Sequence, residues 1–280
     1  MDLISKMARL GANVLDRLQL QATVRQEYDR IRREVELNTP GNPAIYGYKV
    51  YSQCDEDGIL AYIFSKIPTN RIFVEIGCGN GLENNTHALI LAGWRGIWID
   101  GSEHNIRVIR DAIPKNEQLL YQCKMITVEN VIQTIQSLLT GLGTTSTDFL
   151  SIDIDSTDIY VLSEALKYIK PKVLCVEYNA KFPPPLDVKV GPSSTRWAGD
   201  DYQGASLSSF VNILEPLDYK LISCNLSGVN AFFVRNEYAG EFPRYSVAEL
   251  YQPARLYLRR LTSGHRPSLK FLADAVKRTS

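Results

Sequence analysis

The sequence has little cysteine, no excess of charge of either sign and no long apolar run. Its 31 basic and 31 acidic side chains cancel, so no overall field attracts the protein to nucleic acid, although a local patch stays open. The five cysteines are odd in number, scattered and mostly set in apolar stretches. They indicate buried thiols in a reducing compartment, not a disulfide framework or a zinc site.

The N-terminus lacks the pattern of a targeting or membrane-spanning segment. Its first fifteen residues, MDLISKMARLGANVL, carry an acid at position 2 and no charge-free apolar core, so they match neither a signal peptide nor a transmembrane helix. We therefore expect a cytoplasmic protein. At 280 residues with 45% hydrophobic content, the chain can bury one large core with short additions at its ends.

A helix is predicted over the first forty residues, because Leu3, Met7, Leu10, Val14 and Leu18 recur at helical spacing. Pro and Gly in NTPGNPAIYG then break the pattern. The helix has three open roles: docking on its own domain, pairing with a second subunit in a homo-oligomer, or peripheral contact with a membrane surface. We divide the chain into an N-terminal helical extension (1–45), a main domain (46–245) and a helical, mildly basic tail (246–280).

Within the main domain, β-branched strings alternate with helical ones. The expected strands are 72–76, 96–100, 119–127, 149–153, 173–178, 219–224 and 231–234, and the expected helices are 86–92, 104–113, 130–139, 158–169 and 206–214. This alternation predicts an α/β fold, a Rossmann-like doubly wound sheet with helices on both faces. The sheet has seven strands and is mostly parallel, and the closing hairpin contributes one antiparallel strand.

The first of these strands runs into a glycine-rich turn, FVEIGCGNGLENN (73–85). In a doubly wound sheet, ligands bind beyond the carboxyl ends of the strands, and glycine lets a ligand approach the main chain. A phosphate-binding Walker loop needs Lys followed by Ser or Thr, whereas Leu82 and Glu83 follow here. The turn also closes one residue earlier than the dinucleotide fingerprint G-x-G-x-x-G.

The acids around this turn favour a cationic ligand that carries a ribose and no phosphate. Glu75 and Glu83 would repel a diphosphate, and Asp100 ends the second strand, where its carboxylate can accept hydrogen bonds from both ribose hydroxyls. S-adenosylmethionine, with its sulfonium and ammonium groups, fits this description, and Glu75 is placed to attract the ammonium. A nicotinamide cofactor and a purely structural turn remain the alternatives.

Six blocks of the chain together resemble the FkbM-like branch of the Class I S-adenosylmethionine-dependent methyltransferases. They are YSQCDEDGIL (51–60), FVEIGCGNGLENNT (73–86), GWRGIWIDGS (93–102), DFLSIDIDSTD (148–158), VLCVEYNAKFPP (173–184) and SGVNAFFVR (227–235). The resemblance implies a methyl-donor site and a hydroxyl acceptor, often on a sugar or glycosylated natural product. It does not extend to the N-terminal helix or the tail.

The resemblance also assigns residues to the parts of the cofactor. It implies that Ser52, Gln53 and Asp57 close over the methionine end, although a capped helix start explains the acids of that block equally well. Glu83, Asn84 and Asn85 are candidates for the same end, and Val128 and Glu129 for the adenine. The other predicted cofactor contacts are Gly77, Gly79, Asn80, Gly81, Gly101 and Asp153.

Acidic and amide side chains at the ends of the fourth and fifth strands predict a second centre. Asp153 and Asp155 point to one side by strand alternation, as do Glu177 and Asn179, so four oxygen ligands converge if the strands are neighbours. Such a set suits magnesium, manganese or calcium. Without a metal, Asp155 acts as the general base, and the alternative for these carboxylates is helix capping. Asp153 and Lys181 complete the catalytic candidates.

The long irregular segment 181–206 is expected to recognise the acceptor. Arg196, Trp197 and Tyr202 suit a sugar ring and an anionic group on it, and Asn230 is a further candidate for substrate contact. The segment after the fourth strand lacks the amide-Pro-Pro-aromatic tetrad that holds a nucleobase amine. We expect an O-methyltransferase for a saccharide or glycoconjugate, with or without a divalent metal. The alternatives are a non-catalytic binding and assembly protein and a nicotinamide-dependent oxidoreductase.

Overall fold

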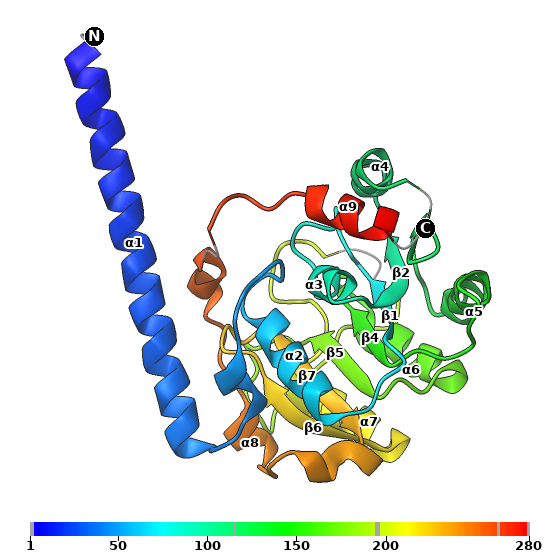
Figure 1. Cartoon of the computed structure of the whole chain (residues 1–280). Coiled ribbons are helices and arrows are strands. Elements are labelled where there is room, and N and C mark those ends of the chain that lie inside the picture. The colour runs from blue at the N-terminus through cyan, green and yellow to red at the C-terminus, as the bar shows by residue number, and fades with distance from the viewer. Residues whose placement is uncertain (1–2, 115, 194–196, 262–263, 279–280) are drawn as a thin grey trace.

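The computed structural model describes residues 3–114, 116–193, 197–261 and 264–278. Its centre is one sheet in the order β3-β2-β1-β4-β5-β7-β6 (Figure 1). The strands are β1 Ile72–Ile76, β2 Arg95–Asp100, β3 Leu119–Cys123, β4 Phe149–Ile152, β5 Val173–Glu177, β6 Tyr219–Cys224 and β7 Asn230–Arg235. β7 pairs antiparallel with both neighbours and the other pairs are parallel. The predicted α/β class, seven strands and single antiparallel strand are confirmed.

Helices cover both faces of the sheet and enclose two apolar cores. The helices of the body are α2 Glu56–Lys66, α3 His87–Leu91, α4 Glu103–Ala112, α5 Val131–Gly141, α6 Asp158–Tyr168 and α7 Leu207–Leu214. Side chains of α2, α3 and α4 share one core with Phe73, and those of α5, α6 and α7 share the other with Val74. Phe73 and Val74 are neighbours in β1, so the strand alternation of side chains separates the two cores.

α1, Leu3–Asn38, is a helix of 36 residues, about 54 Å long at 1.5 Å per residue. Its C-terminal half docks on the body through Val24, Tyr28, Ile31 and Val35, all buried, whose spacing of four, three and four residues places them on one helix face. The N-terminal half projects away from the body (Figure 1). Docking on its own domain therefore accounts for the second half of this helix.

The tail predicted as helical is only partly so. It contains α8 Val247–Leu250, the 3-10 helix η4 Leu256–Arg260 and α9 Lys270–Arg278. Four of its leucines, Leu258, Leu261, Leu269 and Leu272, are buried in the same core as α2 and α3. The tail thus wraps the body and brings η4 toward the carboxyl ends of the strands.

All five cysteines are free, and Cys54, Cys78, Cys175 and Cys224 are buried, as the apolar context of these residues predicts. Among the helices of the described ranges, none has both the length and the apolar character needed to cross a membrane.

The buried hydroxyl of Tyr28 adds hydrogen bonds to the apolar docking of α1. Tyr28 Oη donates to Gly47 O at 2.9 Å and lies 3.3 Å from Asp55 Oδ2. Tyr28→Phe should lower the free energy of unfolding by about 1–3 kcal/mol, because Gly47 O then loses its buried donor. Denaturant unfolding measures the change. Tyr48→Phe, at a side chain that is 51% exposed, is the control and should change stability by less than about 0.5 kcal/mol; equal effects of the two substitutions would contradict this role of Tyr28.

Candidate functional site

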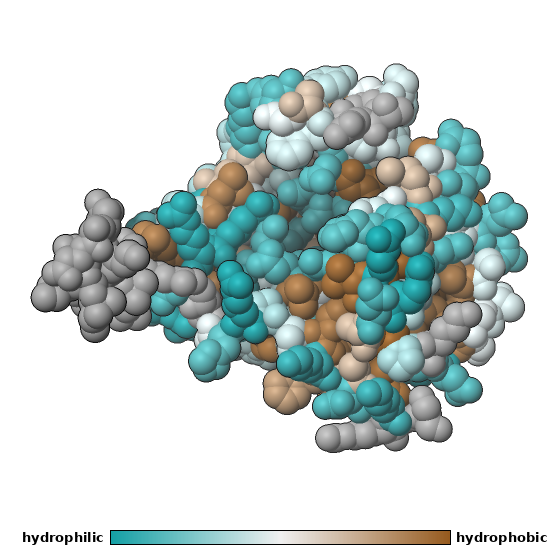
Figure 2. Space-filling view, turned by 90° about the horizontal axis from the view of Figure 1, so that it is seen from above, coloured by the Kyte–Doolittle hydropathy of each residue, from teal (hydrophilic) through white to brown (hydrophobic). Residues whose placement is uncertain are grey.

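A cleft of about 540 Å³ opens where β1, β2 and β4 end. The strand order reverses between β1 and β4, and this is the point where open α/β sheets bind ligands. The lining residues come from the last residues of the strands, the turns after them, the segment before α2, the start of α4 and η4: Gln53, Ile76, Gly77, Gly79, Ile99, Asp100, Gly101, Ser102, Asn105, Lys124, Met125, Ile126, Asp153, Ile154, Asp155, Glu177 and Arg259. Seen from above, the surface of the body has a hollow bordered by both hydrophilic and hydrophobic side chains (Figure 2).

The three glycines of the turn serve different purposes. A Cβ at Gly77 would lie 1.6 Å from the carbonyl oxygen of Asp153, and one at Gly81 would lie 2.7 Å from the Trp98 ring, so the protein's own packing excludes side chains there. Gly79 has φ +56° and a Cβ there would meet nothing within 4 Å. Of the three, Gly79 is therefore the residue that leaves bare main chain beside open space in the cleft.

Asp100, at the end of β2, lies on the rim of the cleft. Its Oδ2 accepts a hydrogen bond from Gly79 N at 2.9 Å, and its Oδ1 accepts from Ser102 N at 2.8 Å and Asn105 Nδ2 at 3.1 Å. These bonds tie the glycine turn to the start of α4. A carboxylate has about four acceptor sites, so Asp100 keeps capacity for a hydroxyl of a ligand, mainly on Oδ2.

Glu75 does not line the cleft, in contrast to its predicted place beside the cofactor ammonium. It is buried beneath the loop that follows the glycines, where it accepts hydrogen bonds from Asn84 Nδ2 at 2.7 Å, Asn85 N at 2.8 Å and the Thr86 hydroxyl. Burial raises the pKa of Glu75 to about 7. Glu75, Asn84 and Asn85 thus hold the loop in shape and are turned away from the ligand space.

Of the three residues predicted to close over the methionine end of the cofactor, two are structural and one lines the cleft. Asp57 Oδ2 accepts from the main-chain N–H groups of Val50, Tyr51 and Ser52 at 2.7–2.8 Å, and the Ser52 hydroxyl accepts from Asp57 N at 3.2 Å. These two residues are buried and shape a turn, whereas Gln53 at the tip of the turn lines the cleft.

Other predicted cofactor contacts lie just beyond the cleft. Asn80 Oδ1 accepts from Leu82 N at 3.2 Å within the glycine turn. Glu83 lines a neighbouring basic cleft. Val128 and Glu129 line an adjoining hollow of about 580 Å³ that shares Met125, Ile126, Ile154 and Asp155 with the cleft, so a ligand that fills the cleft can extend to them.

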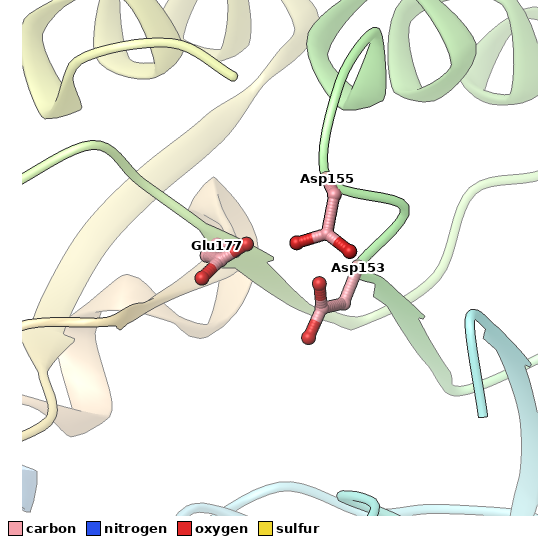
Figure 3. A group of neighbouring side chains, drawn as sticks. All are labelled: Asp153, Asp155 and Glu177. Atoms are coloured by element: carbon pink, nitrogen blue, oxygen red, sulfur yellow. The ribbon is translucent and has the colours of Figure 1, made fainter. Parts of the chain in front are cut away.

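Three carboxylates converge at the ends of β4 and β5. Asp153, Asp155 and Glu177 each offer a ligand atom within 4.8 Å of the other two, and Figure 3 shows the three side chains directed toward one another. Burial, together with the charge of the neighbouring acids, raises the pKa of Glu177 to about 7 and that of Asp153 well above its ordinary value. A bound proton or a bound cation would relieve the repulsion within the group.

The backbone at Asp155 is held in an unfavourable conformation. Asp155 has φ +59°, in the left-handed region that costs an L-residue about 1–2 kcal/mol. Asp158 maintains the turn, because its carboxylate accepts from Ile154 N at 2.8 Å and Ser156 N at 2.9 Å. Asp158 is therefore a positioning residue, and strain of this kind is characteristic of functional sites.

Two other residues predicted for the metal and for catalysis lie outside the carboxylate group. Asn179 Oδ1 accepts from Lys181 N at 3.2 Å, and its Nδ2 donates to Asp201 O and Gln203 O, so its amide anchors the following loop. Lys181 forms an ion pair with Asp201 at an exposed position and does not line the cleft.

The predicted acceptor residues are dispersed. Trp197 lines the hollow that adjoins the cleft, while Tyr202 is exposed and its hydroxyl accepts from Gly191 N at 2.9 Å. Asn230 is buried and donates to Glu56 Oε1 at 3.0 Å, so it belongs to an internal network. Arg196 lies outside the described residues.

Several lining residues were not among those predicted from the sequence. Ser102 and Asn105 directly follow Asp100 at the start of α4, and Ser102 caps this helix; the cap signal could have revealed them. Lys124, Met125 and Ile126 follow β3, which ends at residue 123 instead of 127. Arg259 comes from η4, and no local pattern indicates that it returns to the cleft.

A scan of protein-family models and a search of curated proteins found no match, so the resemblance to the FkbM-like branch stays a prediction. Among solved structures, a fibrillarin pre-rRNA processing protein from Methanococcus jannaschii matches with TM-score 0.43 and 13% identity over 68% of this chain and 78% of its own.

Two solved methyltransferases match at a comparable level. A putative O-methyltransferase from Klebsiella pneumoniae has TM-score 0.40 and 15% identity over 75% of this chain and 89% of its own. CalS10, an amino pentose methyltransferase from Micromonospora echinaspora, has TM-score 0.38 and 11% identity over 66% of this chain and 92% of its own. These values are too low to carry an argument about function, and the fold assignment rests on the strand order.

The raised pKa of Glu75 predicts that the stability of the protein depends on pH. Its pKa is about 7 in the folded protein against an ordinary 4.5, so the folded state binds the proton more tightly and stability falls as pH rises from about 4.5 to 7. Glu75→Gln removes this titration. Its free energy of unfolding relative to wild type should therefore rise by about 2–3 kcal/mol between pH 4 and pH 8, as measured by urea unfolding.

The control for this measurement is Glu83→Gln, at a side chain that is 62% exposed. Its stability relative to wild type should stay constant over the same pH range. A Glu75→Gln difference that is equally constant would refute the assigned direction of the pKa.

Asp155 and Asp218 form a matched pair, since both are aspartates with positive φ, +59° and +72°. Replacement by Gly relieves about 1–2 kcal/mol of strain and adds about 0.5–1 kcal/mol of backbone entropy cost. Asp155→Gly should stabilise the protein by up to about 1 kcal/mol and by more than Asp218→Gly, because it also removes repulsion with Asp153 and Glu177. Urea unfolding measures both variants, and loss of stability in Asp155→Gly alone would sink the strain argument.

Proposed function

We propose that this chain is an S-adenosylmethionine-dependent methyltransferase that acts on a hydroxyl of a saccharide or glycoconjugate. The observation that carries the proposal is the pairing of Gly79, whose missing side chain leaves open space in the cleft, with the Asp100 carboxylate on the rim. The volume of about 540 Å³ lies within the usual range for small-molecule sites.

The charge of the cleft supports a cationic ligand. Its lining contains four acidic side chains, Asp100, Asp153, Asp155 and Glu177, and two basic ones, Lys124 and Arg259. With all four acids ionised the formal charge is minus two, and this excess disfavours a diphosphate and favours a sulfonium with an ammonium group; a proton held between Asp153 and Glu177 reduces the excess. This balance argues against the nicotinamide alternative.

The residues that would hold the cofactor follow from their positions. Asp100 would accept from ribose hydroxyls, the bare main chain at Gly79 would lie beside the ligand, and Gln53 would lie toward its methionine end. Met125 and Ile126 line both the cleft and the adjoining hollow, so the adenine would lie against them. When bound, S-adenosylmethionine supplies an activated methyl group.

Asp155 is the side chain best placed to take the proton from an acceptor hydroxyl. It is exposed and lines both the cleft and the adjoining hollow, and Asp158, not Asp155, bonds the main chain of the turn. Asp153 and Glu177 lie beside it, and their raised pKa values show that the group can hold a proton near neutral pH.

The same three carboxylates fit a divalent cation. They offer oxygen ligands within 4.8 Å of one another, and a cation would remove the repulsion that raises the pKa of Glu177. Hard oxygen donors suit Mg²⁺ or Mn²⁺, and a cation there would lower the pKa of the acceptor hydroxyl.

Calorimetry with S-adenosylhomocysteine tests the cofactor assignment. Asp100→Ala should weaken its binding about 10–100-fold, because a charged hydrogen bond contributes about 1.5–3 kcal/mol. Asp100→Asn, which keeps one acceptor oxygen, should lose less. Glu103→Gln on the exposed surface of α4 is the control, and circular dichroism checks that each variant is folded. Tight binding of a nicotinamide dinucleotide with none of S-adenosylhomocysteine would instead identify an oxidoreductase.

A further inference from the structure

A second cleft, of about 410 Å³, adjoins the candidate active site, and most of the titratable side chains that line it are basic. The basic members come from the segment before α2 and from the C-terminal tail: Lys49, Arg259, Arg260, His265 and Arg266. Among the described residues that line it, Glu83 is the single acid. Positive charge concentrated in a hollow raises the local concentration of anions.

The charge of this basic cleft is only partly neutralised by the protein. Lys49 Nζ lies 3.8 Å from Glu83 Oε1 and donates to Gln53 O at 2.9 Å. Within the ranges that the structure describes, Arg260 and Arg266 have no ion pair with an acidic side chain. Glu27, in the shallow hollow between Arg260 and α1, is already paired with Arg30.

Arg259 joins the basic cleft to the candidate active site, because it lines both. Its Nη2 lies 3.9 Å from Glu177 Oε1, and its Nε is buried without a hydrogen-bond partner. A buried N–H without an acceptor is unfavourable, and a guanidinium binds carboxylate, phosphate and sulfate oxygens through two parallel hydrogen bonds. The positive charge of Arg259 therefore attracts an oxyanion to the boundary between the two clefts.

Apolar side chains lie beside these charges. Tyr51, Leu82 and Phe271 line the same cleft, and Phe271 on α9 is 72% exposed. A ligand for this surface thus combines an anionic group with a body that has apolar faces, which a sugar acid or sugar phosphate provides.

We propose that the basic cleft binds an oxyanion group, carried by the acceptor saccharide, while the acceptor hydroxyl lies at Asp155. This proposal rests on the methyltransferase function, and it narrows the acceptor to acidic saccharides, either uronate or phosphorylated. The carboxylate of the cofactor is an alternative ligand for the same basic side chains. The experiment therefore distinguishes it from an anionic group on the acceptor.

Calorimetry on the full chain, with tetragalacturonate, glucose 6-phosphate and neutral maltotetraose as probes, tests the proposal. An acidic probe should bind at least tenfold more tightly than maltotetraose, and the preferred acidic probe distinguishes the carboxylate from the phosphate source. Arg260→Ala and Arg266→Ala should each weaken acidic-probe binding at least fivefold. Arg107→Ala, at an exposed arginine on α4, is the charge-matched control and should leave binding unchanged.

The outcomes separate this proposal from the methyltransferase function. S-adenosylhomocysteine should bind the Arg260→Ala and Arg266→Ala variants as it binds the wild type; weaker binding would assign the charges to the cofactor carboxylate and overturn the proposal. Equal binding of maltotetraose, an equal effect of Arg107→Ala, or tighter binding of an oligonucleotide of the same charge would also overturn it. Acidic-probe binding does not require the cofactor, so failure of S-adenosylhomocysteine to bind the wild type refutes the methyltransferase function alone.

Discussion

The candidate site depends on one close contact between two chain segments, the approach of Gly77 to the main chain of Asp153. Asp153 N donates to Ile76 O at 3.0 Å and Gly77 N donates to Ile99 O at 2.8 Å, so β1 is joined at its end to both neighbours. No side chain fits at position 77, where a Cβ would lie 1.6 Å from Asp153 O. The contact turns the chain back at the switch point of the sheet, which places Gly79 beside Asp100 on one side and leaves Asp153 next to Asp155 and Glu177 on the other.

The carboxylates of Asp153, Asp155 and Glu177 repel one another, and the surrounding fold holds them close together. Burial and the neighbouring acids raise the pKa of Glu177, Asp155 has a left-handed backbone, and Asp158 holds the turn in which Asp155 lies. A sequence selected for stability alone has no reason to keep three acids within 4.8 Å of one another, because protonation or substitution would relieve them. The arrangement has a physical purpose if a cation or a transferred proton relieves the charge.

The fold was predictable because strand and helix patterns along this chain are regular, and strand ends locate side chains at one edge of a parallel sheet. This rule located Asp100 and Glu177, the last residues of β2 and β5. Asp153 and Asp155 follow the end of β4, and the turn that Asp158 holds brings them to the same edge. Asn179 was not, because alternation applies only within a strand: β5 ends at Glu177, and the Asn179 amide bonds the segment 201–203 instead.

Polar residues near the glycine turn show a second limit of sequence-based prediction. Glu75, Asn84 and Asn85 have the chemistry of ligand contacts, yet a tight turn also needs a buried acceptor for its own N–H groups, and Glu75 accepts from Asn84 Nδ2 and Asn85 N. Sequence alone does not distinguish the two uses. Arg259 was not predicted, because it is separated from Glu177 by more than eighty residues in the sequence and approaches it only through the folding of the C-terminal tail onto the body.

The two clefts explain why a neutral composition is not evidence for a neutral surface. The equal totals of acidic and basic residues hide an acidic cleft at the strand ends and a basic cleft beneath the tail, with Arg259 at their boundary. A cationic cofactor and an anionic acceptor would each be attracted to the cleft of opposite charge, and their charges would attract each other across Arg259 and Glu177. Because an acidic and a basic cleft lie next to each other, they would orient two ligands of opposite charge, whereas a surface with charge of one sign would not.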